Sequence, residues 1–451
     1  HIMKKKISVL INSKIEKFNK IIKVAADKSL SLRALMLASQ CIGISKIKNL
    51  LESEDVLNCL KALRTLGVKI IKDNNTYLVH GNGLNSFKTK KKITKIFVGN
   101  SGTTARLLPG LLSSHVGKFY LYGDKSMNKR DMSRVIEPLE RIGCFFHPSK
   151  KSTLPLILEG TSMPLAQKHI ENRGSAQIKS LILLSALSTP GITSVEEKKI
   201  SRNHTELFLK KINADIKVKK LKKGNLITLR GQKNLYAFNY TVNSDPSSAS
   251  FLIALTLLTP NSKLIIKNVI CNSTRTGFLK ILKEKMNANI KIENLRKISG
   301  ELVGTIIIKS SSLRSINCPK EVVPFLIDEF CILFVIAAVT EGVSKFTGIS
   351  ELRHKESDRI KSMERGLNKI GIKTKSSYDS LNIYGDPTIK IKKKLDIFSN
   401  NDHRVAMSWV ILGLILGGGV KIHNFETVDT SFPNFLSLIQ SMGGKVEIKK
   451  N

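Results

Sequence analysis

One pattern of apolar and polar positions recurs six times along the 451 residues of the chain. In each copy, Leu and Ile at positions i, i+3 and i+4 form the apolar face of a helix, a Gly or Asn follows, and a short apolar strand comes next. Gly and Asn adopt the left-handed conformation that ends many helices, so they mark predicted helix C-termini. These positions are Gly67, Gly143, Asn213, Asn287, Gly371 and Gly443.

The six positions follow one another at intervals of 76, 70, 74, 84 and 72 residues. This period is too long for a solenoid repeat, but it suits a compact α/β unit of several strands and two helices. Six such units in 451 residues predict two domains of three units each. Because no Pro-rich or Gly-rich linker separates the halves, we expect a tight hinge near Asp245.

Composition argues against disorder, since 41% of the residues are hydrophobic and 24% are charged. The 74 Lys and Arg exceed the 35 Asp and Glu by 39. Such an excess favours anionic partners: nucleic acid, a membrane surface or phosphorylated small molecules. However, 58 of these cations are Lys and only 16 are Arg. Lys spread evenly along a chain is more typical of a solvated surface than of nucleic-acid recognition.

The six cysteines form no Cys-x-x-Cys pair, which favours reduced, buried thiols over a zinc site or a disulfide framework. The longest apolar runs, Phe330–Val339 and Trp409–Val420, are shorter than the roughly 20 residues that a membrane-spanning helix needs. The apolar stretch Ile7–Ser13 is too short for a secretory signal. We therefore expect a cytoplasmic protein that does not contact a membrane.

Small polar and cationic residues open most of the predicted apolar helices, where backbone N–H groups and the helix dipole favour anions. The segment DKSLSLRAL places Lys28, Ser29 and Arg33 at such a start, and GNSGTTARLL places Gly102 and Thr103 after a predicted strand. The second segment is not a Walker A loop, because no Gly-Lys-Ser/Thr follows at the required spacing. Each segment alone is also typical of an ordinary helix start or a tight strand–helix turn.

Other helix starts have the same design, and we expect their N-termini to converge on one anionic pocket. A plain capping role is the simpler interpretation of each one alone. His204 lacks a partner at metal-ligand spacing, so a capping or surface role is the simpler interpretation for it. The residues at these starts are Ser175 and Gln177; Ser201, Arg202 and His204; Asp245, Ser247 and Ser248; and Asp402, His403 and Arg404.

Two acidic segments are candidates for proton transfer. Asp328 and Glu329 precede a very apolar run, where a carboxylate is either a helix cap or a base with a raised pKa. The following segment ELRHKESDRI contains Lys355, Glu356 and Arg359. Such a charge cluster is usually a solvated face. Interleaved Lys, Glu and Arg are also what proton transfer onto a bound dianion requires.

Ten segments occur in the order seen in the 5-enolpyruvylshikimate-3-phosphate (EPSP) synthase family, and the chain resembles that family from about Lys5 to Gly444. One such segment has little specificity, but ten in order are highly specific. The Ser-Ala-Gln and Ser-Arg-x-His-Thr-Glu patterns resemble the second, more glyphosate-tolerant class. The segments are DKSLSLRAL, GNSGTTARLL, KRDMSRVIEPL, GSAQIKS, SRNHTE, SDPSSAS, IDE, ELRHKESDRI, NDHRVAM and TSFPNF.

The resemblance implies an α/β fold of two inside-out barrel domains, each with three βαβαββ units. It implies an N-terminal domain over residues 26–244 and a C-terminal domain made of residues 3–25 and 245–451, with the active site in the cleft between them. The implied reaction transfers the enolpyruvyl group of phosphoenolpyruvate to the 5-hydroxyl of shikimate-3-phosphate and releases phosphate through a tetrahedral intermediate. This is a step of the shikimate pathway, leading to chorismate and the aromatic amino acids. It needs no metal or cofactor, and domain closure would exclude water.

The resemblance also implies a role for each matching residue. Asp328 would take the proton from the 5-hydroxyl, Glu356 would protonate the enol methylene carbon, and Lys28 would reach both substrates. The shikimate-3-phosphate ligands would be Lys28, Ser29, Arg33, Ser175, Ala176, Gln177, Ser201, Arg202, Asp328 and Lys355. The phosphoenolpyruvate ligands would be Lys28, Gly102, Thr103, Arg130, Gln177, Arg359 and Arg404.

Three positions bear on how closely the chain follows the family. Asp131 follows Arg130 where the family usually has Pro, and an acid there either weakens the anion site or points away. Thr430 stands where the other class has Lys, so one cation is missing. Gly102 is the inhibitor-permissive residue, so we expect glyphosate to compete with phosphoenolpyruvate.

Two other functions compete with the one that this resemblance implies. The related UDP-N-acetylglucosamine carboxyvinyl transferase shares the fold, but its reactive loop Cys has no counterpart here and Lys28-Ser29 replaces its Lys-Asn start. A basic nucleic-acid-binding protein would need stacking aromatics or a basic helix, and aromatics are only 6% of the chain. We therefore expect a monomer that does not bind nucleic acid, with surface composition as the source of the Lys surplus.

Overall fold

All six predicted helix ends are present in the computed structural model, which describes residues 5–90 and 92–451. Residues 3 and 4 of the predicted C-terminal domain lie outside the described part. The six marked positions have φ between 62° and 119°, and each stands between a helix and a strand. They are Gly67, Gly143, Asn213, Asn287, Gly371 and Gly443.

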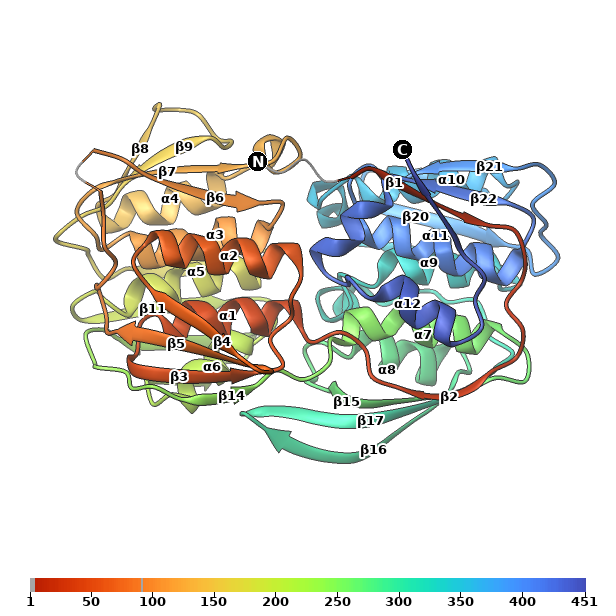
Figure 1. Ribbon diagram of the computed structural model, residues 1–451, viewed down its shortest axis with the longest axis horizontal. Helices are drawn as coiled ribbons and strands as arrows, with labels where there is room; N and C mark the ends of the chain where they lie inside the picture. The colour runs from red at the N-terminus through yellow and green to blue at the C-terminus, as the bar shows by residue number, and fades with distance from the viewer. Residues whose placement is uncertain (1–4, 91) are drawn as a thin grey trace. The chain divides into compact units, whose positions relative to one another are not determined.

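The chain divides into two compact units (Figure 1). The N unit contains Ala26–Val242 and the short segment Lys297–Glu301. The C unit contains the chain up to Ala25, Asn243–Arg296 and Leu302–Asn451. The second crossing therefore lies two residues before the predicted boundary, and the segment Lys297–Glu301 was not predicted to leave the C-terminal domain.

The N unit contains three βαβαββ repeats. In the first, β14 (Asn239–Thr241) supplies the opening strand from the far end of the unit. The remaining elements are α1 (Lys28–Ala38), β3 (Ile42–Lys48), α2 (Glu54–Thr65), β4 (Lys69–Asp73), β5 (Thr76–Asn82); β6 (Thr94–Gly99), α3 (Gly102–Leu112), β7 (Lys118–Gly123), the 3-10 helix η1 (Met127–Lys129), α4 (Ser133–Ile142), β8 (Phe145–His147), β9 (Leu156–Glu159); β10 (Lys168–Glu171), α5 (Ala176–Ala186), β11 (Ile192–Glu197), α6 (His204–Lys211), β12 (Asp215–Lys220) and β13 (Asn225–Arg230).

The C unit follows the same plan and uses the N-terminal strands of the chain. β1 (Ile7–Ile11) pairs with β22 and β23, and β2 (Asn19–Ile22) pairs with β15. The remaining elements are α7 (Pro246–Leu258), β15 (Lys263–Ile270), α8 (Gly277–Lys285), β16 (Asn289–Ile298), β17 (Glu301–Lys309), η2 (Lys320–Phe325); α9 (Phe330–Ala338), β18 (Gly342–Thr347), η3 (Ser350–His354), α10 (Arg359–Lys369), β19 (Lys373–Ser377), β20 (Ser380–Gly385); β21 (Leu395–Phe398), α11 (His403–Leu416), β22 (Val420–His423), η4 (Phe425–Thr430), α12 (Phe435–Ser441) and β23 (Glu447–Lys450).

Most of the sheets share one topology. The opening strand pairs parallel with the second strand, and the later pairings are antiparallel, as in the order β6-β7-β9-β8. The sheet β18-β20-β19 has three strands, and a single parallel bridge from Asn317 to Lys345 stands in place of its opening strand. In each repeat, the first helix therefore connects two neighbouring parallel segments of one sheet. A helix in such a connection must pack against that sheet.

These first helices form the core of each unit. α1, α3 and α5 lie inside the N unit with strands around them, and α7, α9 and α11 do the same in the C unit (Figure 1). Their sequences are apolar on nearly every side, and every residue of α9 is buried. A helix that is apolar all round is stable only when it is enclosed. The charged residues of these helices lie within the first two turns, so the candidate ligands on them gather near the helix N-termini.

The predicted burial of the thiols is confirmed, because all six cysteines are buried and free. Burial raises the pKa of Cys41 and of Cys144 to about 12, so both stay as neutral thiols. Among the described residues, none of the helices combines the length and the apolar character needed to span a membrane.

Candidate functional site

The N-terminus of α1 holds Lys28 in a fixed position. The carboxylate of Asp27 caps the helix by accepting a hydrogen bond from the backbone N–H of Leu30 at 2.8 Å. Lys28 Nζ lies 3.1 Å from Oδ2 of Asp55, which is buried on α2. Two carboxylates therefore fix the backbone and the ammonium group of Lys28 at this helix start.

Arg33 lies one turn further along α1 and is buried. Its Nε donates to Thr205 Oγ1 on α6 at 2.8 Å, and its Nη2 donates to Ser180 Oγ on α5 at 3.3 Å. Its Nη1 donates to the hydroxyl of Ser29. Three helices thus position one guanidinium, and two of the predicted shikimate-3-phosphate ligands, Ser29 and Arg33, are in direct contact.

The N-terminus of α3 brings together the predicted phosphoenolpyruvate ligands of the N unit. Ser101 caps the helix, and a Cβ added to Gly102 would lie 2.6 Å from Nη1 of both Arg106 and Arg130. Two guanidinium groups therefore stand directly over the glycine Cα. Gln177 Nε2 donates to Thr103 Oγ1 at 3.3 Å, which joins the starts of α3 and α5.

The predicted capping role of Ser175 is confirmed, since its hydroxyl accepts from the backbone N–H of Ile178 at 3.3 Å. Ala176 and Gln177 then form the first turn of α5. Further along the chain, Ser201 is buried before α6, and Arg202 beside it is half-buried. Most predicted ligands of the N unit thus lie at or next to a helix start, whereas Arg33 lies in the second turn of α1 and Arg130 follows η1.

His204 is not a surface or capping residue, and that prediction is wrong. It is the first residue of α6, it is buried, and its Nδ1 lies 2.6 Å from Oε1 of the buried Glu301. Asn203 occupies the N-cap position instead. The partner lies 97 positions further along the chain, so the local pattern could not reveal the pair.

The unusual acid Asp131 points its carboxylate at the start of α4. Its two oxygens accept hydrogen bonds from the backbone N–H of Ser133 at 3.2 Å and from the Ser133 hydroxyl at 2.6 Å. This exposed Asp therefore stabilises the turn that precedes α4. Of the two predicted outcomes for Asp131, the geometry favours the one in which the carboxylate points away from the anion site.

In the C unit, Arg359 is the centre of the candidate site. This residue opens α10 and is 2% exposed. Its guanidinium lies 2.9 Å from Asp402 Oδ2, 2.7 Å from Glu356 Oε2 and 3.6 Å from Asp328 Oδ1. Both predicted proton-transfer residues, Asp328 and Glu356, are thus joined to one buried cation.

Burial alone would lower the pKa of Arg359, but the carboxylates of Asp402 and Glu356 raise that pKa well above its ordinary value. The guanidinium is therefore a permanent cation. Asp402 also caps α11 by accepting from the backbone N–H of Arg404 at 3.0 Å. This single carboxylate consequently places Arg359 and Arg404, both predicted phosphoenolpyruvate ligands, relative to each other.

Thr430, the second departure from the family pattern, contacts the same helix start. The hydroxyl of Thr430 lies 2.8 Å from Nδ1 of the buried His403, which stands between Asp402 and Arg404. A Lys at this position would bring a charge, whereas Thr430 brings a neutral hydrogen bond that orients the His403 ring. Lys355, the remaining predicted ligand of the C unit, lies half-buried just after η3.

Several charged residues beside the site escaped the sequence reasoning. Asp55, the partner of Lys28, lies on an ordinary amphipathic helix. Lys179 is fully buried on α5, with Nζ 3.0 Å from Glu197 Oε1 and 2.9 Å from Glu206 Oε2. The available signal was a Lys inside the apolar run IKSLILL, because a lysine in a buried helix must be paired.

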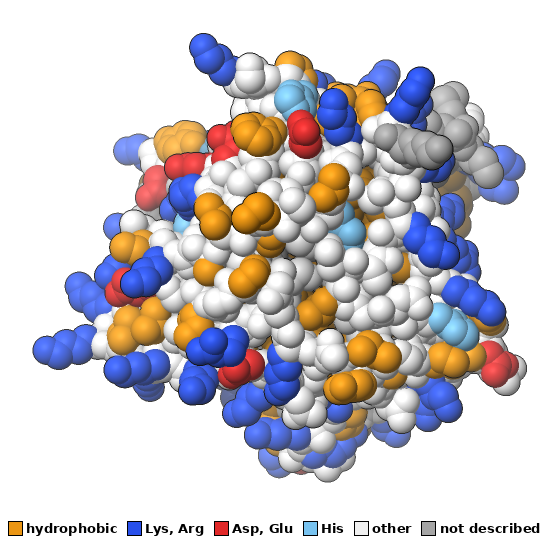
Figure 2. Space-filling model, turned by 90° about the vertical axis from the view of Figure 1, so that its left-hand side faces the viewer, with side chains coloured by type: hydrophobic (Ala, Val, Ile, Leu, Met, Phe, Trp, Pro, Cys, Tyr) orange, Lys and Arg blue, Asp and Glu red, His pale blue; other side chains and the backbone are white. Residues whose placement is uncertain are grey.

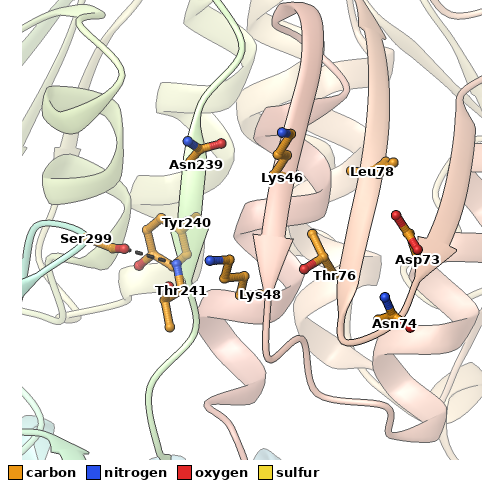
Figure 3. Close-up of a pocket in the computed structure, with 10 residues that line it drawn as sticks. All are labelled: Lys46, Lys48, Asp73, Asn74, Thr76, Leu78, Asn239, Tyr240, Thr241 and Ser299. Atoms are coloured by element: carbon orange, nitrogen blue, oxygen red, sulfur yellow. Dashed lines mark hydrogen bonds between the residues drawn. The ribbon is translucent and has the colours of Figure 1, made fainter.

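A cavity of about 620 Å³ lies elsewhere, on the outer face of the sheet β14-β3-β5-β4 (Figure 3). Lys46 and Lys48 of β3 reach over it, and the hydroxyl of Ser299 accepts from the backbone N–H of Thr241 at 3.0 Å beside it. None of the predicted site residues lines this cavity. Concavity alone therefore does not locate the candidate site, which is defined by the charges at the helix starts.

The cluster around Lys179 yields a prediction about stability and pH. Burial raises the pKa of Glu206, and neighbouring Glu197 adds to this rise while Lys179 opposes it. A raised pKa in the folded state means that the protein becomes less stable as pH rises above the ordinary carboxyl pKa of 4.5. Glu206→Gln removes this titration, so we expect the variant to gain thermal stability relative to wild type between about pH 5 and pH 8.

Thermal unfolding of both proteins at the two pH values measures this effect. The matched control is Glu137→Gln, at a side chain that is 73% exposed beside Arg141. It should follow wild type at both pH values. A melting difference between Glu206→Gln and wild type that does not change with pH would contradict the prediction.

Known proteins are similar to this chain along nearly its whole length. The sequence profile described as EPSP synthase (3-phosphoshikimate 1-carboxyvinyltransferase) matches residues 12–439. The 3-phosphoshikimate 1-carboxyvinyltransferase of Zymomonas mobilis is 38% identical over 443 residues, covering 97% of each chain. That of Petrotoga mobilis is 40% identical over 432 residues, covering 95% of this chain and 98% of the relative.

Solved structures agree. The EPSP synthase of Acinetobacter baumannii superimposes with a TM-score of 0.84 at 37% identity, covering 98% of this chain and 100% of that one. The enolpyruvyl transferase NikO of Streptomyces tendae has a TM-score of 0.75 at 13% identity, which shows a shared fold only. The predicted α/β fold class is therefore confirmed.

Proposed function

Because the chain belongs to the EPSP synthase family, we propose that it is a 3-phosphoshikimate 1-carboxyvinyltransferase acting in the shikimate pathway. It would transfer the enolpyruvyl group of phosphoenolpyruvate to the 5-hydroxyl of shikimate-3-phosphate and release phosphate. The observation that carries this proposal is the buried guanidinium of Arg359, because it joins Asp328 and Glu356 at one cation. Proton removal and proton donation can then occur beside one bound anion.

In the N unit, the cations at the helix starts would bind shikimate-3-phosphate. Lys28 and Arg33 come from α1, and Arg202 precedes α6. Three positive charges suit a phosphate dianion and a carboxylate, and Arg binds such groups through two parallel hydrogen bonds. Ser29, Ser175, Ala176 and Gln177 lie in the first turns of α1 and α5 or cap them, where backbone N–H groups add donors.

Phosphoenolpyruvate would be bound by residues of both units. The N unit would supply Lys28, Gly102, Thr103, Arg130 and Gln177. The C unit would supply Arg359 and Arg404, and its Lys355 would orient shikimate-3-phosphate. We propose that both sets act on the same pair of substrates, so that neither unit alone is an active enzyme.

The reaction would proceed by addition and elimination. Glu356 donates a proton to C3 of phosphoenolpyruvate, which makes C2 cationic. Asp328 takes the proton from the 5-hydroxyl, and the oxygen bonds to C2 to give a tetrahedral intermediate. Loss of a C3 proton and of phosphate then restores the double bond. An anion bound at Arg359 competes with Glu356 for the guanidinium, which favours the protonated form of Glu356 that this step needs.

Release of inorganic phosphate tests the proposal directly. Purified protein is mixed with shikimate-3-phosphate and phosphoenolpyruvate, and phosphate is followed over time. Release that depends on both substrates is expected. A folded protein that releases none would refute the proposed activity. Omitting each substrate in turn controls for simple hydrolysis of phosphoenolpyruvate.

Gly102→Ala should weaken phosphoenolpyruvate binding. Its Cβ would lie 2.6 Å from Nη1 of Arg106 and of Arg130, so both guanidinium groups must move. Displacing an anion-binding Arg by about 1 Å costs roughly tenfold to a hundredfold in binding or rate. We expect KM for phosphoenolpyruvate to rise about tenfold with little change for shikimate-3-phosphate, as steady-state kinetics would show. An unchanged KM would exclude Arg130 as a ligand.

Glyphosate should inhibit wild type competitively against phosphoenolpyruvate, because Gly102 leaves space beside Arg130. Gly102→Ala should also reduce this inhibition. Inhibition that is not relieved by added phosphoenolpyruvate would contradict a shared site.

We also propose that the enzyme is monomeric and cytoplasmic and does not bind nucleic acid. In support, Lys and Arg side chains are spread around the rim of the face shown in Figure 2 and do not gather in one patch. The proposed site uses five of the 16 Arg but only two of the 58 Lys. The Lys surplus therefore belongs to the surface, where it would at most steer anionic substrates over long distances.

A further inference from the structure

A buried ionic cluster lies behind the loop that carries Ser201 and Arg202. Lys179 of α5 is 0% exposed, and its ammonium group contacts Glu197 at the end of β11 and Glu206 on α6. One ammonium group therefore ties three elements together. A buried charge is costly unless it is paired and hydrogen-bonded, so this cluster strongly constrains the spacing of α5, β11 and α6.

Glu197 extends the cluster to the loop. Its Oε1 accepts hydrogen bonds from the backbone N–H of Ser201 at 3.0 Å and from the Ser201 hydroxyl at 2.9 Å. Its Oε2 accepts from Asn225 Nδ2 at 3.1 Å. A serine hydroxyl has one proton to donate. While Ser201 donates to Glu197, it cannot also donate to a substrate phosphate.

The same two helices hold the second cation of the proposed phosphate site. Ser180 follows Lys179 on α5, and Thr205 precedes Glu206 on α6. Ser180 Oγ and Thr205 Oγ1 lie 2.6 Å apart, and both accept hydrogen bonds from Arg33. The spacing that Lys179 fixes between α5 and α6 is therefore also the spacing that places Arg33.

We propose that Lys179, Glu197 and Glu206 form a positioning cluster for shikimate-3-phosphate, and that Ser201 anchors the loop to this cluster instead of binding the phosphate itself. This inference rests on the proposed function. The cluster holds Arg202 and Arg33 ready before substrate arrives, which reduces the ordering cost of binding. Disturbing it should weaken shikimate-3-phosphate binding and leave phosphoenolpyruvate binding largely intact.

A double-mutant cycle with Glu197→Gln and Ser201→Ala separates the two roles of Ser201. We expect Glu197→Gln to raise KM for shikimate-3-phosphate about tenfold and Ser201→Ala about threefold, with the double variant no worse than Glu197→Gln alone, because both changes break one unit. If the double variant instead raised KM for shikimate-3-phosphate about thirtyfold, the product of the two single effects, Ser201 would bind substrate independently and the inference would be overturned. KM for phosphoenolpyruvate and kcat should change by less than about threefold.

Lys179→Met should give the same selective rise in KM for shikimate-3-phosphate, and Lys179→Arg should recover part of it. The control is Lys72→Met, which removes an exposed ion pair with Glu52 in the same unit. A merely structural role would reduce the amount of active enzyme and lower kcat while leaving both KM values unchanged, which would overturn the inference. If Lys179→Met does not fold, the Glu197–Ser201 cycle still decides the question.

Wild type that released no phosphate would refute the proposed function. Active wild type together with an unchanged KM for shikimate-3-phosphate in Glu197→Gln would refute this inference alone.

Discussion

Asp328→Asn is expected to lower kcat by about a thousandfold, within the range of about 10²–10⁴ that a positioned general base contributes. Asn keeps the shape of the side chain but cannot take the proton from the 5-hydroxyl of shikimate-3-phosphate. Asp328 is 21% exposed and 3.6 Å from Arg359 Nη1, so losing its charge should disturb the fold little. Steady-state phosphate release and a thermal melt measure the two effects separately.

Asp386→Asn is the matched control. This Asp is partly exposed in the same unit, where it accepts hydrogen bonds from the hydroxyl and the backbone N–H of Thr388. It should leave both turnover and melting unchanged. Wild-type turnover in Asp328→Asn would remove this residue from the mechanism.

Arg359→Met should have the largest effect on stability. It leaves Asp328, Glu356 and Asp402 around an apolar side chain, and Asp402 is 0% exposed. Removing one partner of a buried ionic network costs about 3–5 kcal/mol, because the remaining charges lose their compensation. We expect the free energy of unfolding of the C unit to fall by about this amount in urea, and activity to be lost with it.

Two further variants isolate the cause. Arg359→Lys keeps the charge but cannot reproduce the planar, several-donor contact, so it should recover stability more than activity. Lys291→Met removes an exposed pair in the same unit, in which the two side chains are 72% and 51% exposed, and should change neither. Unaltered unfolding of Arg359→Met would mean that the three carboxylates do not depend on the guanidinium.

The features of the fold that depend on residues close together in the sequence could be predicted. Gly or Asn at a helix end requires a left-handed backbone, and the six such positions correctly located the second helix of every repeat. Caps were equally local: Asp245 accepts from the backbone N–H groups of Ser247 and Ser248, as its position before α7 predicted.

Pairings between distant residues could not be predicted in the same way. The contacts of Lys179, the bond between His204 and Glu301 and the meeting of Arg359 with Asp402 join residues 18 to 97 positions apart. Which side chains meet depends on how whole repeats pack, and a hydrophobic pattern does not contain that information. The candidate ligands came from the resemblance to a family. The residues that support these ligands could be identified only from the packing of α5, β11 and α6 and of α10 and α11, because the paired side chains lie on different elements.

The strand pairings also set an order for folding during synthesis. Apart from Lys297–Glu301, the N unit is one continuous stretch of chain, so it can fold soon after Val242 leaves the ribosome. The C unit cannot: β1 lies between β22 and β23, so the first strand made must wait for the last. During this interval β1 is an unpaired strand that can aggregate, whereas β2 waits only for its partner β15. The charged residues of KKKISVLINSKIEKFNK, in and around these two strands, are well placed to keep each strand in solution until its partner has been made.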